Sequence, residues 1–134
     1  MARVFVDGSY SSKNPDVTGW GYMSEDRTVS KDGKLTGDIT SLHQVGGELK
    51  ATMEAICHFA NQGEREITIL HDYLGVSEWA NGGWRTKNHY THDYAEYVKS
   101  IRAKGIVINF EKIDAADNPA DELARKHTGA EYAH

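Results

Sequence analysis

Two short apolar runs that each end in an aspartate constrain the fold of this chain most. Val4-Phe5-Val6 leads into Asp7, and the run at 66–71 (EITILH) leads into Asp72. The segment 47–62 between them carries apolar side chains at the spacing of one helix face. In a sheet with parallel central strands, the carboxyl ends of the strands face one crevice. Asp7 and Asp72 therefore meet in that crevice if the two strands are neighbours.

Turn residues and hydrophobic periodicity divide the rest of the chain into further elements. Strands are predicted at 2–10, 18–25, 34–42 and 106–113, and helices at 73–81, at 92–104 and from 119 onward. Asn118 would cap the last helix and Pro119 would be its first residue, because the missing proline N–H has no helical partner there. This order of elements implies a mixed α/β sheet with helices packed on its faces.

Size and composition restrict the class of protein. The 134 residues fit one domain, and no apolar run approaches the roughly 20 residues that span a bilayer. The N-terminus lacks the long apolar core of a signal peptide. The single cysteine, Cys57, cannot form an internal disulfide, and we expect a small buried residue beside Ile56 on the helix stripe. These features predict a cytoplasmic protein without membrane association.

The net charge of −5 conceals an uneven distribution. Residues 79–105 hold five basic and two acidic side chains, a balance of +3 that leaves −8 for the remainder. A basic segment beside an acidic body suits a protein that binds a polyanion at one place and cations at another. Ordinary solvated helix faces explain the same charges equally well.

Two further acids stand at element ends. Glu48 follows Gly46-Gly47 at the predicted start of a helix, and Asp121 lies in the first turn of the last helix. Each acid alone has a structural explanation, since helix N-termini favour negative charge. Four converging acids, however, favour a site for hard cations, because clustered carboxylates repel unless a metal neutralises them. Two Mg²⁺ ions roughly 4 Å apart can stabilise the attacking and leaving oxygens of a phosphodiester displacement.

Five segments carry a resemblance to a known family. They are VDGSY, GWGY, GGELKATMEAI, ILHDYLGVSEWANGGW and NPADELAR. In this order they resemble type 1 ribonuclease H, in the branch often fused to an N-terminal hybrid-binding domain, a domain that we do not expect here. The resemblance implies a ribonuclease H-like α/β fold over residues 1–134, with a five-stranded mixed sheet in the order 3-2-1-4-5 and helices on both faces. It also implies a monomeric endonuclease that uses two Mg²⁺ ions, or Mn²⁺, to hydrolyse the RNA strand of RNA–DNA hybrids, leaving 5′-phosphate and 3′-hydroxyl ends.

The resemblance assigns site residues as well. It implies a catalytic and metal-binding tetrad of Asp7, Glu48, Asp72 and Asp121. The residues that it implies contact the RNA strand are Gly8, Ser9, Gln44, Gly46 and Gly47. Those that it implies contact the DNA strand are Trp84, Arg85, Lys87 and Asn88. In this interpretation Gly8 lets the substrate backbone approach and Ser9 offers it a hydrogen bond. For Trp79 we favour core packing.

The chain also departs from the family pattern. Type 1 enzymes commonly carry a histidine in the loop before the last helix, whereas 112–120 (KIDAADNPA) has none. Asp114 or Asp117 could take part instead, or turnover could be slower, and His127 is expected to be a helix-end residue. We expect His71 to pack or hydrogen-bond beside Asp72.

Two competing functions remain open. One is a non-catalytic nucleic-acid-binding module of the same fold, which the four retained acids oppose. The other is a different nuclease of the superfamily, such as a junction resolvase or an exonuclease, from which the DGS and ADELA segments point away.

Overall fold

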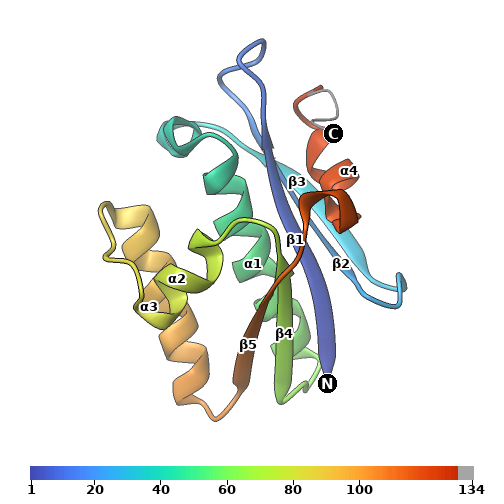
Figure 1. The fold of residues 1–134 in the computed structure, drawn as a ribbon, viewed down its shortest axis with the longest axis vertical. Coiled ribbons are helices and arrows are strands. Elements are labelled where there is room, and N and C mark those ends of the chain that lie inside the picture. The colour runs from blue at the N-terminus through green and yellow to red at the C-terminus, as the bar shows by residue number, and fades with distance from the viewer. Residues whose placement is uncertain (130–134) are drawn as a thin grey trace.

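Five strands of the described chain form one mixed sheet in the order β3-β2-β1-β4-β5 (Figure 1). The computed structural model describes residues 1–129. The strands are β1 (Ala2–Tyr10), β2 (Thr18–Ser24), β3 (Ser30–Leu35), β4 (Glu66–His71) and β5 (Val107–Lys112). β1 pairs antiparallel with β2 and parallel with β4, while β2 pairs antiparallel with β3 and β4 parallel with β5. The predicted sheet and its strand order are confirmed.

Helices cover both faces of this sheet (Figure 1). Residues 1–129 contain α1 (Gln44–Asn61), α2 (Gly75–Asn81), α3 (His89–Ala103) and α4 (Ala120–Arg125), with short 3-10 turns at Asp38–Leu42 and Ala115–Asp117. None of these helices is long and apolar enough to cross a bilayer.

Two glycines show that α1 and α4 lie on opposite faces. A Cβ at Gly8 would stand 2.6 Å from the backbone nitrogen of Glu48 in α1, and a Cβ at Gly21 would stand 2.6 Å from the Cβ of Leu123 in α4. Gly21 pairs with Asp7, the strand neighbour of Gly8. Because successive residues of a strand point to opposite faces, Asp7 points toward the α4 side while Gly8 points toward α1.

The main core lies between the sheet and α1. Val4 and Val6 of β1 and Ile67 and Ile69 of β4 are almost completely buried, and they share one apolar cluster with Leu49, Ala55, Ile56 and Phe59 of α1. Burial of such side chains is the dominant stabilising contribution to a fold of this size. The apolar runs therefore hold β1 and β4 in the centre of the sheet, where both aspartates end up.

Several sequence expectations need correction. The third strand lies at 30–35 rather than 34–42, because its residues (SKDGKL) form a polar edge strand without hydrophobic alternation. α1 begins at Gln44, so Gly46 and Gly47 are helical residues and do not precede the helix. Cys57 is exposed rather than buried. The buried face of α1 runs through Ala55 and Phe59, which leaves Cys57 on the solvent side.

Candidate active site

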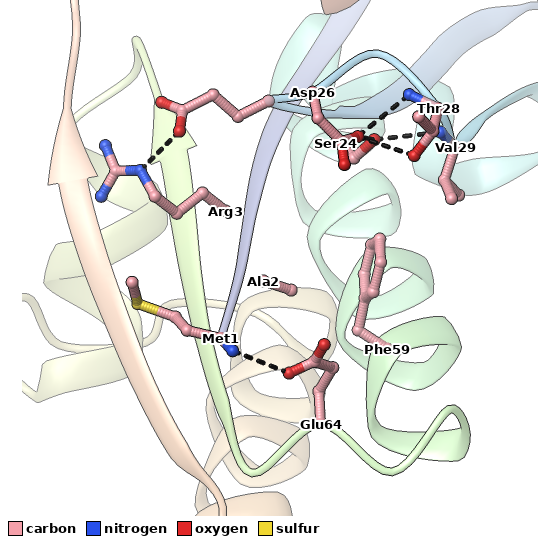
Figure 2. A pocket seen from close by; sticks show the side chains of 10 residues that line it. Met1, Ala2, Arg3, Ser24, Asp26, Thr28, Val29, Phe59 and Glu64 are labelled. Carbon is pink, nitrogen blue, oxygen red and sulfur yellow. Dashed lines mark hydrogen bonds and ion pairs between the residues drawn. The ribbon is translucent and has the colours of Figure 1, made fainter.

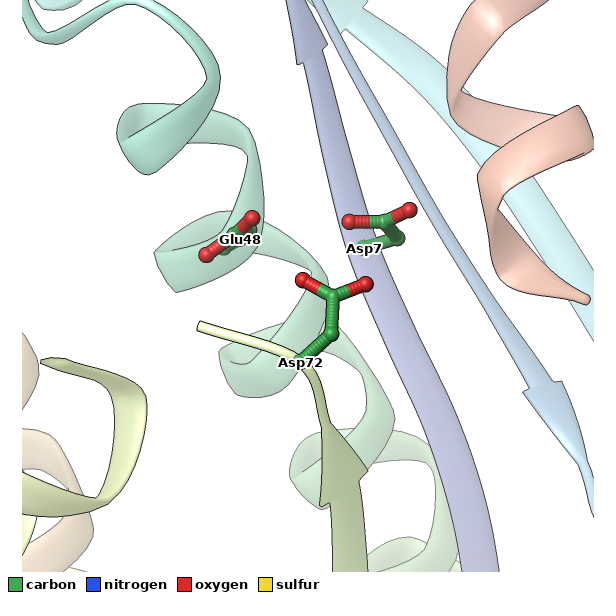
Figure 3. A group of neighbouring side chains, drawn as sticks. All are labelled: Asp7, Glu48 and Asp72. Carbon is green, nitrogen blue, oxygen red and sulfur yellow. The ribbon is translucent and has the colours of Figure 1, made fainter. Parts of the chain in front are cut away.

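Three acidic side chains converge where β1 and β4 end beside α1. The parallel register aligns Phe5 of β1 with Leu70 of β4, so Asp7 and Asp72 come level two residues later. One oxygen each from Asp7, Glu48 and Asp72 lie within 4.8 Å of one another. Figure 3 shows these carboxyl groups pointing toward a common centre from β1, α1 and the end of β4. The structure thus brings together three of the four predicted acids.

Burial makes this cluster electrostatically costly. Asp7 and Glu48 are only 5% and 4% exposed. Burial, reinforced by the charge of Asp72, raises the pKa of Asp7 to about 8. Burial followed by the charge of Asp7 holds the pKa of Glu48 well above its ordinary value, and burial also raises that of Asp72. A divalent cation would relieve both the repulsion and the desolvation.

The fourth predicted acid, Asp121, borders the same site from α4. Its charge contributes to the raised pKa of Asp7 and of Asp72. One of its carboxylate oxygens accepts a hydrogen bond from Nε of Arg125 at 2.9 Å. All four acids line a cavity of about 240 Å³, together with Gly8, Gln44, Tyr73 and Ala115.

The donor set of this cavity fits hard cations. Carboxylate oxygens are the ligands that Mg²⁺ and Mn²⁺ prefer in proteins. Oε2 of Glu48 is buried and accepts no hydrogen bond from the described residues. Because a buried carboxylate oxygen is costly without a partner, this atom fits a site for a cation at the centre of the cluster.

Four of the five residues expected to contact RNA have packing roles in the structure. Gly8 lies against the first turn of α1, where any side chain would collide with the backbone of Gln44 and Glu48. This close approach requires a glycine whether or not a substrate binds. The hydroxyl of Ser9 is buried and lies 2.9 Å from that of Thr128. Gln44 is exposed and borders the carboxylate cavity.

Gly46 and Gly47 are buried in the first turn of α1. A Cβ at Gly47 would stand 2.9 Å from Cα of Gly8, and one at Gly46 would stand 3.0 Å from Cγ1 of Ile39. Gly47 therefore lets the helix approach β1 closely enough for Glu48 to reach Asp7, while Gly46 leaves room for the 3-10 turn that holds Ile39.

An aromatic cluster adjoins the carboxylates on the α2 side. The ring centroids of Tyr73, Trp79 and Trp84 lie 5.4 to 6.1 Å apart. These rings line a cavity of about 510 Å³ with Gly83, Arg85 and Lys87. Trp84 is 37% exposed, whereas Trp79 is partly buried. Tyr73 also borders the carboxylate cavity, so it separates the acidic site from the aromatic cavity with its basic residues Arg85 and Lys87.

Asn88, expected at the DNA strand, has a structural partner. Its side chain accepts a hydrogen bond from the backbone N–H of Thr91 at 2.9 Å, and its own N–H donates to the Thr91 hydroxyl. This reciprocal cap starts α3 at His89, three residues before the predicted start. Asn88 thereby fixes the loop that presents Arg85 and Lys87.

The two histidines near the site lie away from its centre. His71 is buried, with Nδ1 2.9 Å from the carbonyl oxygen of Tyr73, and burial lowers its pKa. It packs beside Asp72 as expected. His127 follows α4, and its Nε2 lies 2.6 Å from a carboxylate oxygen of Asp32 in β3. Tyr73 was not predicted as a site residue, although its position directly after Asp72 is a signal that could have found it.

Comparisons with known proteins place this geometry in a fold family. No family model and no curated protein sequence matches the chain. Among solved structures, RNase H1 from the halophilic archaeon Halobacterium salinarum NRC-1 is 18% identical, with a TM-score of 0.75 over 93% of this chain and 95% of that chain. The N-terminal RNase H domain of rv2228c from Mycobacterium tuberculosis is 20% identical, with a TM-score of 0.70 over 94% and 93%.

A third structure contains nucleic acid. LC11-RNase H1, isolated from compost by a metagenomic approach, was solved in complex with an RNA/DNA hybrid. It is 16% identical, with a TM-score of 0.78 over 94% of this chain and 95% of that chain. These likenesses establish that the chain has the ribonuclease H-like fold.

Proposed function

We propose that this chain is a divalent-metal-dependent endoribonuclease that hydrolyses the RNA strand of RNA–DNA hybrids and leaves 5′-phosphate and 3′-hydroxyl ends. One observation carries the proposal: the buried Asp7 and Glu48 and the half-buried Asp72 each place one carboxylate oxygen within 4.8 Å of the others. The likeness to LC11-RNase H1, whose structure holds an RNA/DNA hybrid, supports the substrate class.

The acidic tetrad would hold the cations, with Mg²⁺ as the expected ion and Mn²⁺ as an alternative. Asp7 and Asp72 would be the central ligands, Glu48 would lie nearest the scissile ribose, and Asp121 would complete the set from α4. When bound, two such ions supply the charge stabilisation that a phosphodiester displacement needs. Because the pKa of Asp7 is raised to about 8, its carboxyl group holds a proton near neutral pH until a cation displaces it.

The two strands of a hybrid would lie on different sides of Tyr73. On the acidic side, Gln44 and the backbone of Gly8, Ser9, Gly46 and Gly47 are the proposed contacts to the RNA strand. The wide minor groove of an A-like duplex exposes ribose 2′-hydroxyls to such polar groups.

On the other side, the cavity beneath Trp84 suits the DNA strand. The exposed part of the Trp84 side chain would offer an apolar surface for deoxyribose, while Arg85 and Lys87 would hold phosphates. Asn88 contributes by capping the helix that carries this loop. We propose that the protein binds the hybrid as a monomer.

Cleavage of an end-labelled hybrid tests the proposal. Wild type and Asp72→Asn are incubated with Mg²⁺, Mn²⁺ or EDTA, next to single-stranded RNA, duplex RNA and duplex DNA. Metal-dependent cutting confined to the RNA strand of the hybrid, and lost in Asp72→Asn, is the expected result. Hybrid binding without cutting under any metal would assign the chain to the binding modules, and cutting of duplex DNA would assign it to another nuclease of this fold.

A further inference from the structure

A buried asparagine links three of the elements that surround the carboxylates. Asn118 lies in the segment before α4 and is only 5% exposed. Its Nδ2 donates hydrogen bonds of 2.9 Å to the carbonyl oxygen of Val6 and to Oδ2 of Asp72. Its Oδ1 accepts a hydrogen bond of 3.1 Å from the backbone N–H of Ala120. One amide therefore contacts β1, the end of β4 and the start of α4.

Each of these contacts lies at or beside a proposed metal ligand. Val6 precedes Asp7 in β1, and Ala120 precedes Asp121 in α4. The third contact is with the carboxylate of Asp72 itself. Because Nδ2 donates to Oδ2 of Asp72, it fixes the orientation of the whole carboxylate, and this carboxylate belongs to the cluster with Asp7 and Glu48.

We propose that Asn118 is a positioning residue that fixes the carboxylate of Asp72 relative to Asp7 and Asp121 and so sets the geometry in which the site binds divalent cations. This inference rests on the proposed function, since it assumes that the tetrad holds cations. In this role Asn118 acts through its hydrogen bond to Asp72. It is neither a metal ligand nor a contact to substrate.

The chemistry of the side chain supports this role. An amide offers two N–H donors and a carbonyl acceptor on one rigid plane. The partners of Asn118 are two acceptors and one donor, so they determine which amide atom is which. A serine could reach only one of the two acceptors. An aspartate would keep the acceptor for Ala120 but would turn a negative charge toward Asp72.

A role in helix capping alone is the competing explanation, because the bond to Ala120 resembles an N-cap. Asn118→Asp separates the two roles. Aspartate is as good a helix cap as asparagine, so this variant retains the cap and loses both donors. Asn118→Ala loses all three hydrogen bonds.

A matched control lies at the opposite end of β1. Figure 2 shows Ser24, whose buried hydroxyl donates to Asp26 at 2.7 Å and accepts from the backbone N–H of Val29 at 3.0 Å. It lines a cavity of about 270 Å³ near the ion pair between the N-terminal amine and Glu64. Ser24→Ala therefore removes a buried hydrogen-bonded side chain of the sheet without touching the carboxylates.

The test compares wild type with Asn118→Ala, Asn118→Asp and Ser24→Ala in the full chain. Thermal unfolding is followed during titration with Mg²⁺ and with Mn²⁺ in the absence of nucleic acid, and kcat and KM are then measured on a hybrid. Mutation of a residue that hydrogen-bonds to a metal ligand typically lowers metal affinity by about 10- to 100-fold. The metal midpoint is the cation concentration at which half of the metal-induced rise in melting temperature is reached. For both Asn118 variants we expect this midpoint to rise about tenfold and kcat to fall, with little change in KM for the hybrid.

The outcomes separate the two claims. Ser24→Ala should lower the melting temperature and leave the metal midpoint unchanged. An Asn118→Asp protein with the midpoint and kcat of wild type would overturn the positioning role, as would an equal midpoint shift in Ser24→Ala. Wild type that shows neither a metal-induced shift nor cleavage would overturn the proposed function, and the role of Asn118 with it.

Discussion

Replacing Asp7 with asparagine should stabilise the metal-free protein. Asparagine has nearly the same shape as aspartate and cannot ionise. Oδ1 of Asp7 accepts a hydrogen bond of 2.9 Å from the backbone N–H of Gly8, and an asparagine oxygen can accept the same bond. The substitution therefore removes mainly the electrostatic cost of a carboxylate buried beside Glu48 and Asp72.

The size and sign of the effect follow from the pKa of Asp7. Burial raises this pKa from its ordinary value of 3.8 to about 8. Between these two values the folded state binds a proton that the unfolded state has lost, so the stability of the metal-free protein falls as pH rises. At about 1.4 kcal/mol per pKa unit, the full displacement is worth roughly 6 kcal/mol, an upper bound that water penetration and side-chain movement reduce.

We expect Asp7→Asn to gain about 1 to 3 kcal/mol over wild type near pH 9, which corresponds to roughly 5 to 10 °C in melting temperature for a chain of this length. The gain should shrink toward pH 5, because Asp7 of wild type is then protonated. The assay is thermal and urea unfolding in EDTA across this pH range. Asp16→Asn, at an exposed loop position, serves as the control.

Addition of Mg²⁺ should reverse the order of stabilities, since wild type gains a ligand that the variant binds poorly. The variant should also lose cleavage of hybrids. A variant no more stable than wild type near pH 9, or a gain that grows toward low pH, would refute the claim that charge at Asp7 is costly in this fold.

Other substitutions test packing and substrate contacts. Gly8→Ala should destabilise the protein by about 3 kcal/mol in urea unfolding, since its Cβ would overpack the start of α1 2.6 Å from the nitrogen of Glu48. Arg102→Met should cost about 2 kcal/mol in the same assay, because the guanidinium of Arg102 donates a 2.6 Å hydrogen bond to the carbonyl oxygen of Ile108. Trp84→Ala should raise KM for the hybrid about tenfold with little change in melting temperature, as its partly exposed ring is the proposed support for deoxyribose. Binding should weaken steeply with salt, and Lys87→Ala should reduce the slope of log K against log salt by about one, if Lys87 contacts a phosphate. A salt slope equal to that of wild type would contradict this contact.

The parts of the fold that sequence reasoning predicted well are those in which burial dictates the pattern. The apolar run ending at Asp7 and the run at 66–71 are central strands, and their side chains had to be apolar because helices and neighbouring strands enclose them. β3 lies at an edge and is largely exposed, so its polar residues carry no periodic signal. Its position was therefore predicted several residues too late.

Side-chain partnerships were harder to predict than elements. The sequence marks Gly8 as unusual, but only the structure shows that α1 rather than a substrate occupies the space beside it. Asn118 was predicted as the cap and Pro119 as the first residue of the last helix, but α4 begins at Ala120 with Pro119 at the cap position. The bond from the Ala120 N–H to Asn118 still resembles a cap. Its bonds to Val6 and Asp72 join residues 112 and 46 positions away in the chain, a relation that no local pattern encodes.

The distribution of charge bears on the choice between an enzyme and a binding module. A surface that only binds nucleic acid gains affinity from positive charge, and this chain concentrates such charge around Arg85 and Lys87, beyond Tyr73 from the acids. The carboxylate cavity has the opposite character, and two of its acids, Asp7 and Glu48, are buried at a cost that appears in their raised pKa values. Without cations, these groups either keep a proton at the expense of their ionised form or repel the phosphates that the neighbouring basic surface attracts. Cations in the cavity would displace the protons and neutralise the carboxylates, and a phosphodiester could then approach them, so the arrangement favours metal-dependent hydrolysis over binding alone.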